Sequence, residues 1–227
     1  MIIGITGLIG SGKDTIAAHL VEHYSYERYS WATPLKDIAS TLFGWDRDML
    51  EGATPDQRAQ RELKDEWWSS QLGKDWSPRY ALQIMGTEVM RDALHPDIWV
   101  LAGMHRVAGK NNVVISDTRF PNEIKALRKM GGVIWNVQRG SVPEWYAALT
   151  GFKADWPDCG QFQIENFMKT TFPAIHASEY SWHGTKFDAV IDNNGTIDEL
   201  KTQVDLIIGD QFRSLSMRQS RDLCKTV

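Results

Sequence analysis

The chain has 227 residues, 42% hydrophobic and 24% charged, a composition that excludes a disordered or fibrous protein and is sufficient for a buried core. Its formal charge of -4 gives no general attraction to nucleic acid or to an anionic membrane, so a phosphate-binding surface must be local. Cys159 and Cys224 lie far apart without a CxxC or Cys/His cluster, which argues against structural zinc or a disulfide framework and favours a cytoplasmic location.

The N-terminal half begins with a short apolar run over residues 2–5, the pattern of a buried parallel strand, directly before a glycine-rich turn. A helix carrying Ile16, Leu20 and Tyr24 follows. No apolar stretch approaches the ~20 residues of a membrane span, and the start of the chain lacks the basic region of a signal peptide. A second strand is expected over 29–32, and Thr33 with Pro34 opens a helix to about Phe43.

Residues 44–78 are polar and rich in tryptophan, and we interpret them as an inserted flap. A capping box over residues 54–57 predicts a helix from there through Trp68. Most tryptophans are expected in core and flap packing. Ser77 and Pro78 start another helix, and a further helix spans roughly 97–107. One face of the helix after Pro78 would carry Leu82, Met85, Val89 and Met90.

The second half alternates strands and helices. Strands are expected over 113–116, 133–137 and 189–192, with a helix from Pro121 after the first and a helix from Thr196 through Ile208 after the last. Residues 138–178 are irregular in pattern and predict a lid or insertion. The alternation predicts an α/β fold, a mainly parallel sheet flanked by helices, in a single domain over 1–211 with a polar, mobile tail over 212–227.

A phosphate-binding loop is predicted between the first strand and the first helix. Residues 7–13 match G-x-x-x-x-G-K in that context, in which glycines let successive N–H groups point inward and a lysine reaches the outer phosphates. The helix N-terminus adds positive potential. The residues assigned to ATP binding are Gly10, Ser11, Gly12, Lys13, Asp14 and Thr15.

Asp14 stands where a hydroxyl that ligates Mg²⁺ is usual in such loops. A carboxylate beside phosphates is repelled unless a cation lies between them, so Asp14 implies Mg²⁺. Either Asp14 contacts the ion, directly or through water, or it positions Thr15, whose hydroxyl and N–H meet the α-phosphate.

Cationic side chains along the chain are candidates for a phosphorylated acceptor. Asp117 ends a central strand and Arg119 follows, which places both at the carboxyl edge of the sheet, where such folds bind ligands. Phosphoryl transfer depends on positioning and charge neutralisation, so Lys13, Arg119, Asp117 and Arg139 are the expected catalytic group. Arg58 and Arg61 share one face of the flap helix, and Lys36 and Arg79 lie on neighbouring helices. A solvated surface is the competing interpretation for these cations.

Several motifs spread in order over the chain resemble the deoxynucleoside monophosphate kinases of bacteriophages. They are Ser11-Gly12-Lys13-Asp14-Thr15, Pro34-Leu35-Lys36-Asp37, Leu82-Gln83-Ile84-Met85-Gly86-Thr87-Glu88, Ile98-Trp99-Val100, Asp117-Thr118-Arg119 and Val190-Ile191-Asp192-Asn193-Asn194-Gly195-Thr196.

The resemblance implies an adenylate-kinase-like P-loop NTPase fold, ATP as phosphate donor, Mg²⁺, a deoxynucleoside monophosphate as acceptor and a homodimer. The negative charge and the lack of a long apolar stretch predict neither nucleic acid nor a membrane as partner. Two other functions stay open: a P-loop kinase of another phosphorylated metabolite, of the dephospho-coenzyme A or phosphomevalonate type, and a non-catalytic ATP-binding module. The acceptor would be surrounded by Lys36, Arg58, Arg79, Gly86, Thr87, Trp99, Asp117, Arg119 and Glu123.

Overall fold

The protein is described from a computed structural model that covers residues 1–223, with side chains through residue 211. The chain divides into two compact units, which we describe separately. The sheet unit comprises Met1–Arg28 and the chain from Asn111 onward, and the helical unit comprises Tyr29–Lys110.

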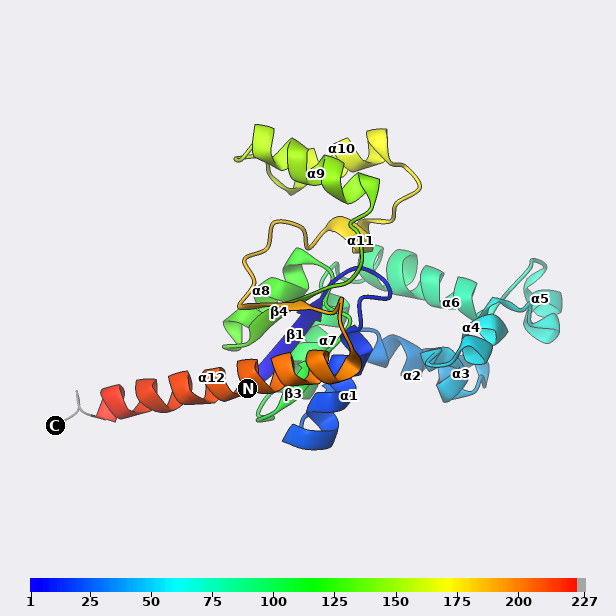
Figure 1. Ribbon diagram of the computed structural model, residues 1–227. Helices are drawn as coiled ribbons and strands as arrows, with labels where there is room; N and C mark the ends of the chain where they lie inside the picture. Colours follow the sequence, from blue (N-terminus) through cyan, green and yellow to red (C-terminus); the bar gives the residue numbers. More distant parts are fainter. Residues whose placement is uncertain (224–227) are drawn as a thin grey trace. The chain divides into compact units, whose positions relative to one another are not determined.

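The sheet has five strands in the order β2-β3-β1-β4-β5. β1 pairs in parallel with β3 and β4, and β4 pairs in parallel with β5. The predicted α/β fold with a parallel sheet is therefore confirmed (Figure 1). The strands are β1 (Ile2–Thr6), β2 (Glu27–Tyr29), β3 (Val113–Ile115), β4 (Val133–Gln138) and β5 (Ala189–Asp192).

The core explains why β1 is continuously apolar. Ile3 and Ile5 have no exposed surface and pack with Ile16 and Leu20 of α1 (Lys13–Tyr24) and with α12 (Ile197–Leu223). On the other face a Cβ at Gly4 would lie 2.4 Å from Leu127 Cδ1 of α8 (Pro121–Lys129), so the glycine permits close packing of that helix. Helices on both faces leave no side of this strand for water.

The strand order places the ends of three strands at one edge. β3 and β4 flank β1, so the phosphate-binding loop after β1, Asp117 after β3 and Arg139 after β4 all follow carboxyl ends of adjacent strands. In open parallel sheets ligands bind at this edge, where the strand order changes direction. The topology thus positions the predicted residues of the sheet unit together.

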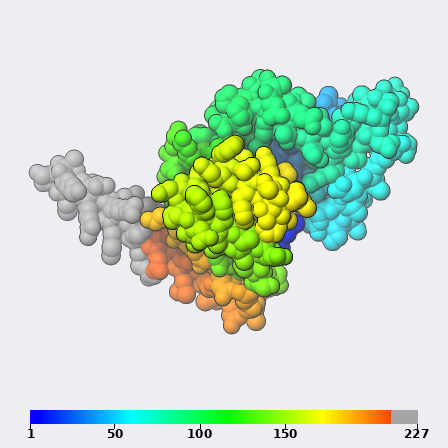
Figure 2. Space-filling model, turned by 90° about the horizontal axis from the view of Figure 1, so that it is seen from above, coloured from blue at the N-terminus to red at the C-terminus, as the bar shows by residue number. Residues whose placement is uncertain are grey.

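The segment predicted as irregular contains three helices, α9 (Glu144–Asp155), α10 (Gln161–Thr171) and α11 (Ala177–Tyr180). They enclose a core of their own with Leu149, Met168 and Tyr180. In Figure 1, α9 and α10 lie together and α11 lies between them and the sheet; Figure 2 looks onto this yellow-green to yellow surface. The prediction that residues 138–178 are irregular was wrong. Glycine and proline residues between the helices obscured the apolar pairs at i, i+4 spacing within them.

The helical unit contains six α-helices and one π-helix among its residues: α2 (Thr33–Phe43), α3 (Arg47–Glu51), α4 (Pro55–Glu62), α5 (Glu66–Leu72), α6 (Pro78–Ile84), η1 (Met85–Asp92) and α7 (Ile98–Val107). Trp45 and Trp76 are buried with Leu50 and Leu82, as expected for flap tryptophans. The predicted capping box at Thr54 is confirmed. A helix through Trp68 was wrong, because the chain leaves helix at Glu62 and the Asp65 side chain caps a new one.

Three further boundaries differ from the sequence prediction. β2 ends at Tyr29 instead of running to residue 32, and α12 continues to Leu223 instead of ending at Ile208. The prediction of one continuous apolar face on the helix after Pro78 was also wrong. The α-helix widens to a π-helix at Met85, and Val89 is 50% exposed. Of the tail predicted as mobile, residues 212–223 continue α12, and 224–227 lie outside the described residues. Within the described part, no helix has the length and apolar character to cross a bilayer.

Candidate phosphate-binding site

The loop between β1 and α1 has a backbone that only glycine adopts without strain. Gly7, Gly10 and Gly12 have φ angles of 141°, 76° and 103°. A Cβ at Gly7 would lie 2.4 Å from the Val137 carbonyl oxygen, and one at Gly12 would lie 2.3 Å from Asn193 Nδ2. Glycine is therefore required at Gly7 and Gly12 both for backbone conformation and for space. The loop leads directly into the N-terminus of α1, whose positive potential attracts anions.

The Lys13 side chain contacts the backbone of the phosphate-binding loop. Its Nζ donates hydrogen bonds to the carbonyl oxygens of Gly7 (2.8 Å) and Leu8 (2.7 Å). Burial, followed by the positive charge of Arg119, lowers the pKa of Lys13 to about 8. Ser11 Oγ is buried without a hydrogen-bond partner among the described residues. A desolvated ammonium and an unsatisfied buried hydroxyl fit an incoming phosphate, which would supply acceptor oxygens to both.

Asn193, in the turn after β5, holds the backbone of the phosphate-binding loop by a hydrogen bond. Its Nδ2 donates to the Ser11 carbonyl oxygen (2.8 Å), and its own N–H donates to the Gln138 carbonyl oxygen (2.8 Å). Asn193 is 8% exposed, so these bonds form largely away from water. The side chain thus links the phosphate-binding loop to the ends of β4 and β5.

Asp14 is held by two neighbours and remains accessible. Its carboxylate pairs with Arg28 and accepts a hydrogen bond from Ser116 Oγ (3.2 Å), while 77% of the side chain is exposed. The described residues hold no group of three or more His, Cys, Asp or Glu suited to a metal ion. An Mg²⁺ ion near Asp14 would therefore need phosphate oxygens and water as its remaining ligands, the arrangement that Mg²⁺ favours at nucleotide sites.

The turn after β3 is shaped by Glu123. The Glu123 carboxylate is 3% exposed and accepts hydrogen bonds from the backbone N–H groups of Arg119 (2.7 Å) and Phe120 (3.0 Å). This fixes the backbone from which the Arg119 side chain projects. Arg119 acts electrostatically on Lys13, as does Asp117, so the turn and the loop meet within the sheet unit.

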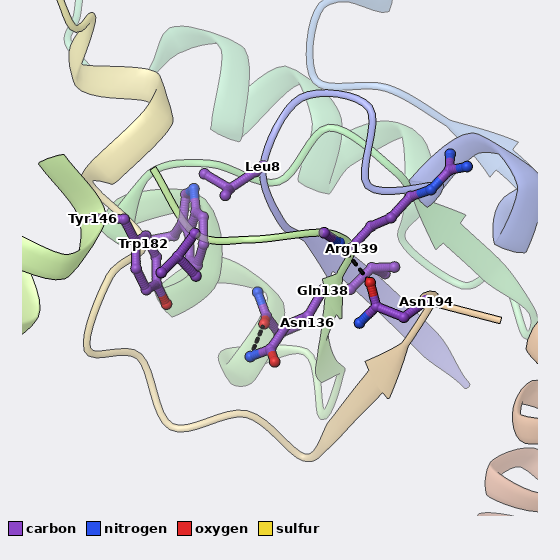
Figure 3. Close-up of a pocket in the computed structure, with 10 residues that line it drawn as sticks. Leu8, Asn136, Gln138, Arg139, Tyr146, Trp182 and Asn194 are labelled. Carbon is purple, nitrogen blue, oxygen red and sulfur yellow. Dashed lines mark hydrogen bonds between the residues drawn. The ribbon is translucent and has the colours of Figure 1, made fainter. Parts of the chain in front are cut away.

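A pocket opens beside the loop, and Figure 3 shows its lining. Tyr146 and Trp182 form one wall, and the Arg139 side chain points away from these two rings. The main chain after Arg139 is held because Gly140 N–H donates to Asn194 Oδ1 (2.6 Å). The pocket is lined by Leu8, Asn136, Val137, Gln138, Arg139, Gly140, Val142, Tyr146, Trp182 and Asn194.

In the helical unit, Lys36 belongs to a network of ion pairs. Its side chain is 12% exposed, and its Nζ lies 2.8 Å from Glu51 Oε1. Glu51 also accepts from Arg47 (2.9 Å), which pairs with Asp37 (2.9 Å). A phosphate near Lys36 would have to compete with the Glu51 carboxylate.

The flap arginines contact carbonyl groups of their own unit. Arg58 Nη1 donates to the Gly52 and Ala53 carbonyl oxygens (3.0 Å each), and Arg61 Nη1 donates to the Leu50 carbonyl oxygen (3.2 Å). Arg79 is 58% exposed and lies 3.9 Å from Glu62. Arg58 therefore stabilises the turn between α3 and α4, Arg61 the end of α3, and Arg79 lies on the surface.

The predicted motif around Gly86 forms a local contact with α7. Trp99 is 5% exposed, and its Nε1 donates to the Gly86 carbonyl oxygen (2.9 Å) within the π-helix. Thr87 next to it is exposed. The indole therefore anchors the π-helix, a role compatible with the core packing expected for most tryptophans.

Sequence reasoning did not select three residues that the structure brings to the loop. Arg28 and Ser116 hold Asp14, and Asn193 holds Ser11. Asn193 lies in one of the resembling motifs, which was a usable signal. Arg28 is an isolated arginine at a short strand, and no local pattern marks it.

Two curated proteins are similar in sequence to this chain. A protein of Acanthamoeba polyphaga mimivirus, provisionally named deoxynucleotide monophosphate kinase, is 28% identical over 221 residues, which cover 90% of this chain and 94% of that protein. The deoxynucleoside-5'-monophosphate kinase of Escherichia phage T5 is 27% identical over 180 residues, covering 57% of this chain and 72% of that protein. The predicted resemblance is confirmed. No protein-family model matches the chain.

Solved structures give more distant likenesses. A gluconokinase from Sinorhizobium meliloti 1021 aligns with a TM-score of 0.42 at 12% identity, over 95% of each chain. A shikimate kinase from Aquifex aeolicus aligns with a TM-score of 0.43 at 14% identity, over 93% of this chain and 98% of that one. Likenesses at this level carry no argument about activity.

Proposed function

We propose that this protein transfers the γ-phosphoryl group of ATP to a deoxynucleoside monophosphate, giving the diphosphate and ADP. The observation that carries the proposal is the glycine loop between β1 and α1, with a half-buried Lys13 and an unsatisfied Ser11 hydroxyl. The similarity to the mimivirus protein over 90% of the chain supports the choice of acceptor.

The chain's own residues would bind and align two anions. Backbone N–H groups of the loop and the N-terminus of α1 would hold the donor phosphates, with Lys13 reaching their outer oxygens. Arg119 would stabilise negative charge on the transferred group. A monophosphate acceptor is already an ionised nucleophile, so the reaction needs no dedicated general base.

Mg²⁺ and the acceptor residues are parts of the same proposal. Mg²⁺ supplies charge neutralisation between phosphates when bound, and Asp14 would hold it with phosphate oxygens and water. For the acceptor we retain Asp117 and Glu123 in the sheet unit and the residues that the motifs selected in the helical unit, namely Lys36, Arg58, Arg79, Gly86, Thr87 and Trp99. Arg139 is retained as a further cation for ATP or the transferred phosphoryl.

An acceptor panel tests the function directly. ADP release would be measured with ATP and Mg²⁺ and each deoxynucleoside and ribonucleoside monophosphate, together with dephospho-coenzyme A and phosphomevalonate. We expect stimulation by at least one deoxynucleoside monophosphate, and loss of that stimulation in Lys13→Ala. Stimulation by another metabolite alone, or ATP binding that no acceptor converts into turnover, would replace the proposal by one of the two alternative functions.

Assembly and location complete the proposal. We propose a homodimer, as the family resemblance implies, and a location in the cytoplasm of an infected cell, by analogy with the viral origin of the curated relatives. Sedimentation at several protein concentrations would distinguish a dimer from a monomer.

A further inference from the structure

The Arg119 side chain is held by the inserted helices. Its Nη1 lies 3.2 Å from Ser178 Oγ and 3.3 Å from Glu179 Oε1, both on α11. Neither contact uses Nη2 or Nε. A residue at the end of β3 is therefore tied to a helix almost sixty residues later in the chain, inside the sheet unit.

Both ends of this connection are anchored. Tyr180, next to Glu179, is 2% exposed in the core formed with α9 and α10. Ser178 also hydrogen-bonds His176 Nδ1 (3.0 Å), which caps α11. On the other side the backbone of Arg119 is fixed by the buried Glu123. The Arg119 and Glu179 side chains thus meet between two backbone positions that are each held by buried contacts.

The charge of Glu179 acts on the phosphate-binding loop as well. Among the charges near Lys13, Arg119 lowers the pKa of its ammonium, while Asp14, Glu179 and Asp117 raise it. Glu179 therefore lies near both cations to which the proposed mechanism assigns phosphate oxygens. Its carboxylate offsets part of their mutual repulsion before a nucleotide binds.

We propose that Glu179, assisted by Ser178, is a positioning residue that holds Nη1 of Arg119 and so presents the Nη2 and Nε edge to the phosphoryl group in transfer. The inference rests on the proposed function. An arginine with free rotamers must be ordered each time it acts, whereas one held by a carboxylate is ordered beforehand. The insertion thereby contributes to catalysis through a residue outside it.

Kinetics of three single variants test the proposal. Glu179→Ala should lower kcat about 10-fold or more with little change in KM for ATP, because alignment is lost while the loop is intact. Glu179→Gln keeps a hydrogen-bond acceptor and should retain most of the activity. Glu165→Gln is the matched control, since that carboxylate lies on α10 of the same insertion and pairs with Lys169 at 4.0 Å. It should behave as the unaltered protein.

A double variant separates positioning from a general structural effect. If Glu179 acts through Arg119, then Arg119→Ala with Glu179→Ala should be no slower than Arg119→Ala alone. Losses that multiply, or an unchanged kcat in Glu179→Ala, would overturn the inference.

A spectroscopic measurement keeps the inference testable even if no monophosphate is an acceptor. Arg119 labelled with ¹⁵N should show a restricted Nε–Hε signal in the unaltered protein and in Glu165→Gln, assigned by its loss in Arg119→Lys. The signal should become mobile in Glu179→Ala and stay restricted in Glu179→Gln, and Glu179→Leu, which also removes the acceptor, serves if Glu179→Ala does not fold. A restricted signal in the variant without the acceptor would refute positioning, while an inert acceptor panel with the expected signals would refute only the proposed reaction.

Discussion

Replacing Asn193 by alanine should disturb the phosphate-binding loop, although Asn193 is not itself one of the residues proposed to contact ATP. The side chain donates to the Ser11 carbonyl oxygen at 2.8 Å and is 8% exposed. Alanine removes the donor and leaves a buried carbonyl group without that partner. It also removes the amide that lies against Gly12, so the loop gains freedom at its second glycine turn.

The size of the effect follows from the burial of the bond. Leaving a buried acceptor unsatisfied costs about 1–3 kcal/mol. In a chain of this length each 1 kcal/mol lowers Tm by roughly 2–4 °C, so we expect Tm to fall by about 2–12 °C. If all of this free energy appeared as loss of loop order, ATP binding would weaken by about 5-fold to about 150-fold, since 1.4 kcal/mol corresponds to tenfold.

Two measurements on two variants decide the matter. Thermal unfolding gives the change in Tm, and ATP titration gives the change in Kd, for Asn193→Ala and for Gln203→Ala. Gln203 Nε2 donates to the Asp192 carbonyl oxygen (2.7 Å) and its Oε1 accepts from the Asp192 N–H (3.2 Å), so its hydrogen bonds lie in the same region but go to β5 and not to the loop. We expect both variants to lose stability and only Asn193→Ala to lose ATP affinity. Equal Kd values in the two variants would refute the assignment of Asn193 as the support of the loop.

Three more predictions concern charge. Because the pKa of Lys13 is lowered to about 8, its ammonium is lost as pH rises through that value, so ATP affinity should fall above about pH 8; titrations that stay flat to pH 9.5 would contradict this. Asp14→Asn removes the negative charge next to Arg28 and should raise the Mg²⁺ concentration needed for half-maximal turnover several-fold. Asp48→Asn on α3 is the control. An unaltered Mg²⁺ dependence in Asp14→Asn would remove Asp14 from the metal site. Burial lowers the pKa of His183 to about 4, so between pH 6.5 and 4 the unfolded chain binds a proton that the folded chain does not. Tm should therefore fall on acidification, and less steeply in His183→Gln than in a variant of the exposed His105; parallel curves would show that His183 does not contribute.

Local signals in the sequence were sufficient for the sheet and the loop. A strand buried on both faces needs an unbroken apolar run, and a loop that bends around phosphate needs glycine where φ is positive. Neighbouring residues alone were therefore sufficient to predict β1 and the glycine loop with Gly7, Gly10 and Gly12. The carboxyl ends of adjacent parallel strands then bring Asp117 and Arg119 near the loop, because parallel strands share a direction. The placement of these residues required no knowledge of individual side-chain contacts.

Only the tertiary structure decided which partner each charged side chain takes. Arg28 pairs with Asp14, Glu179 with Arg119 and Lys36 with Glu51, and each pair joins separate elements. The flap arginines share a helical face as predicted, but that periodicity could not show that Arg58 donates to carbonyl groups of a turn. A long cationic side chain binds any acceptor that folding brings within reach, and this depends on chain segments whose separation in sequence carries no periodic signal.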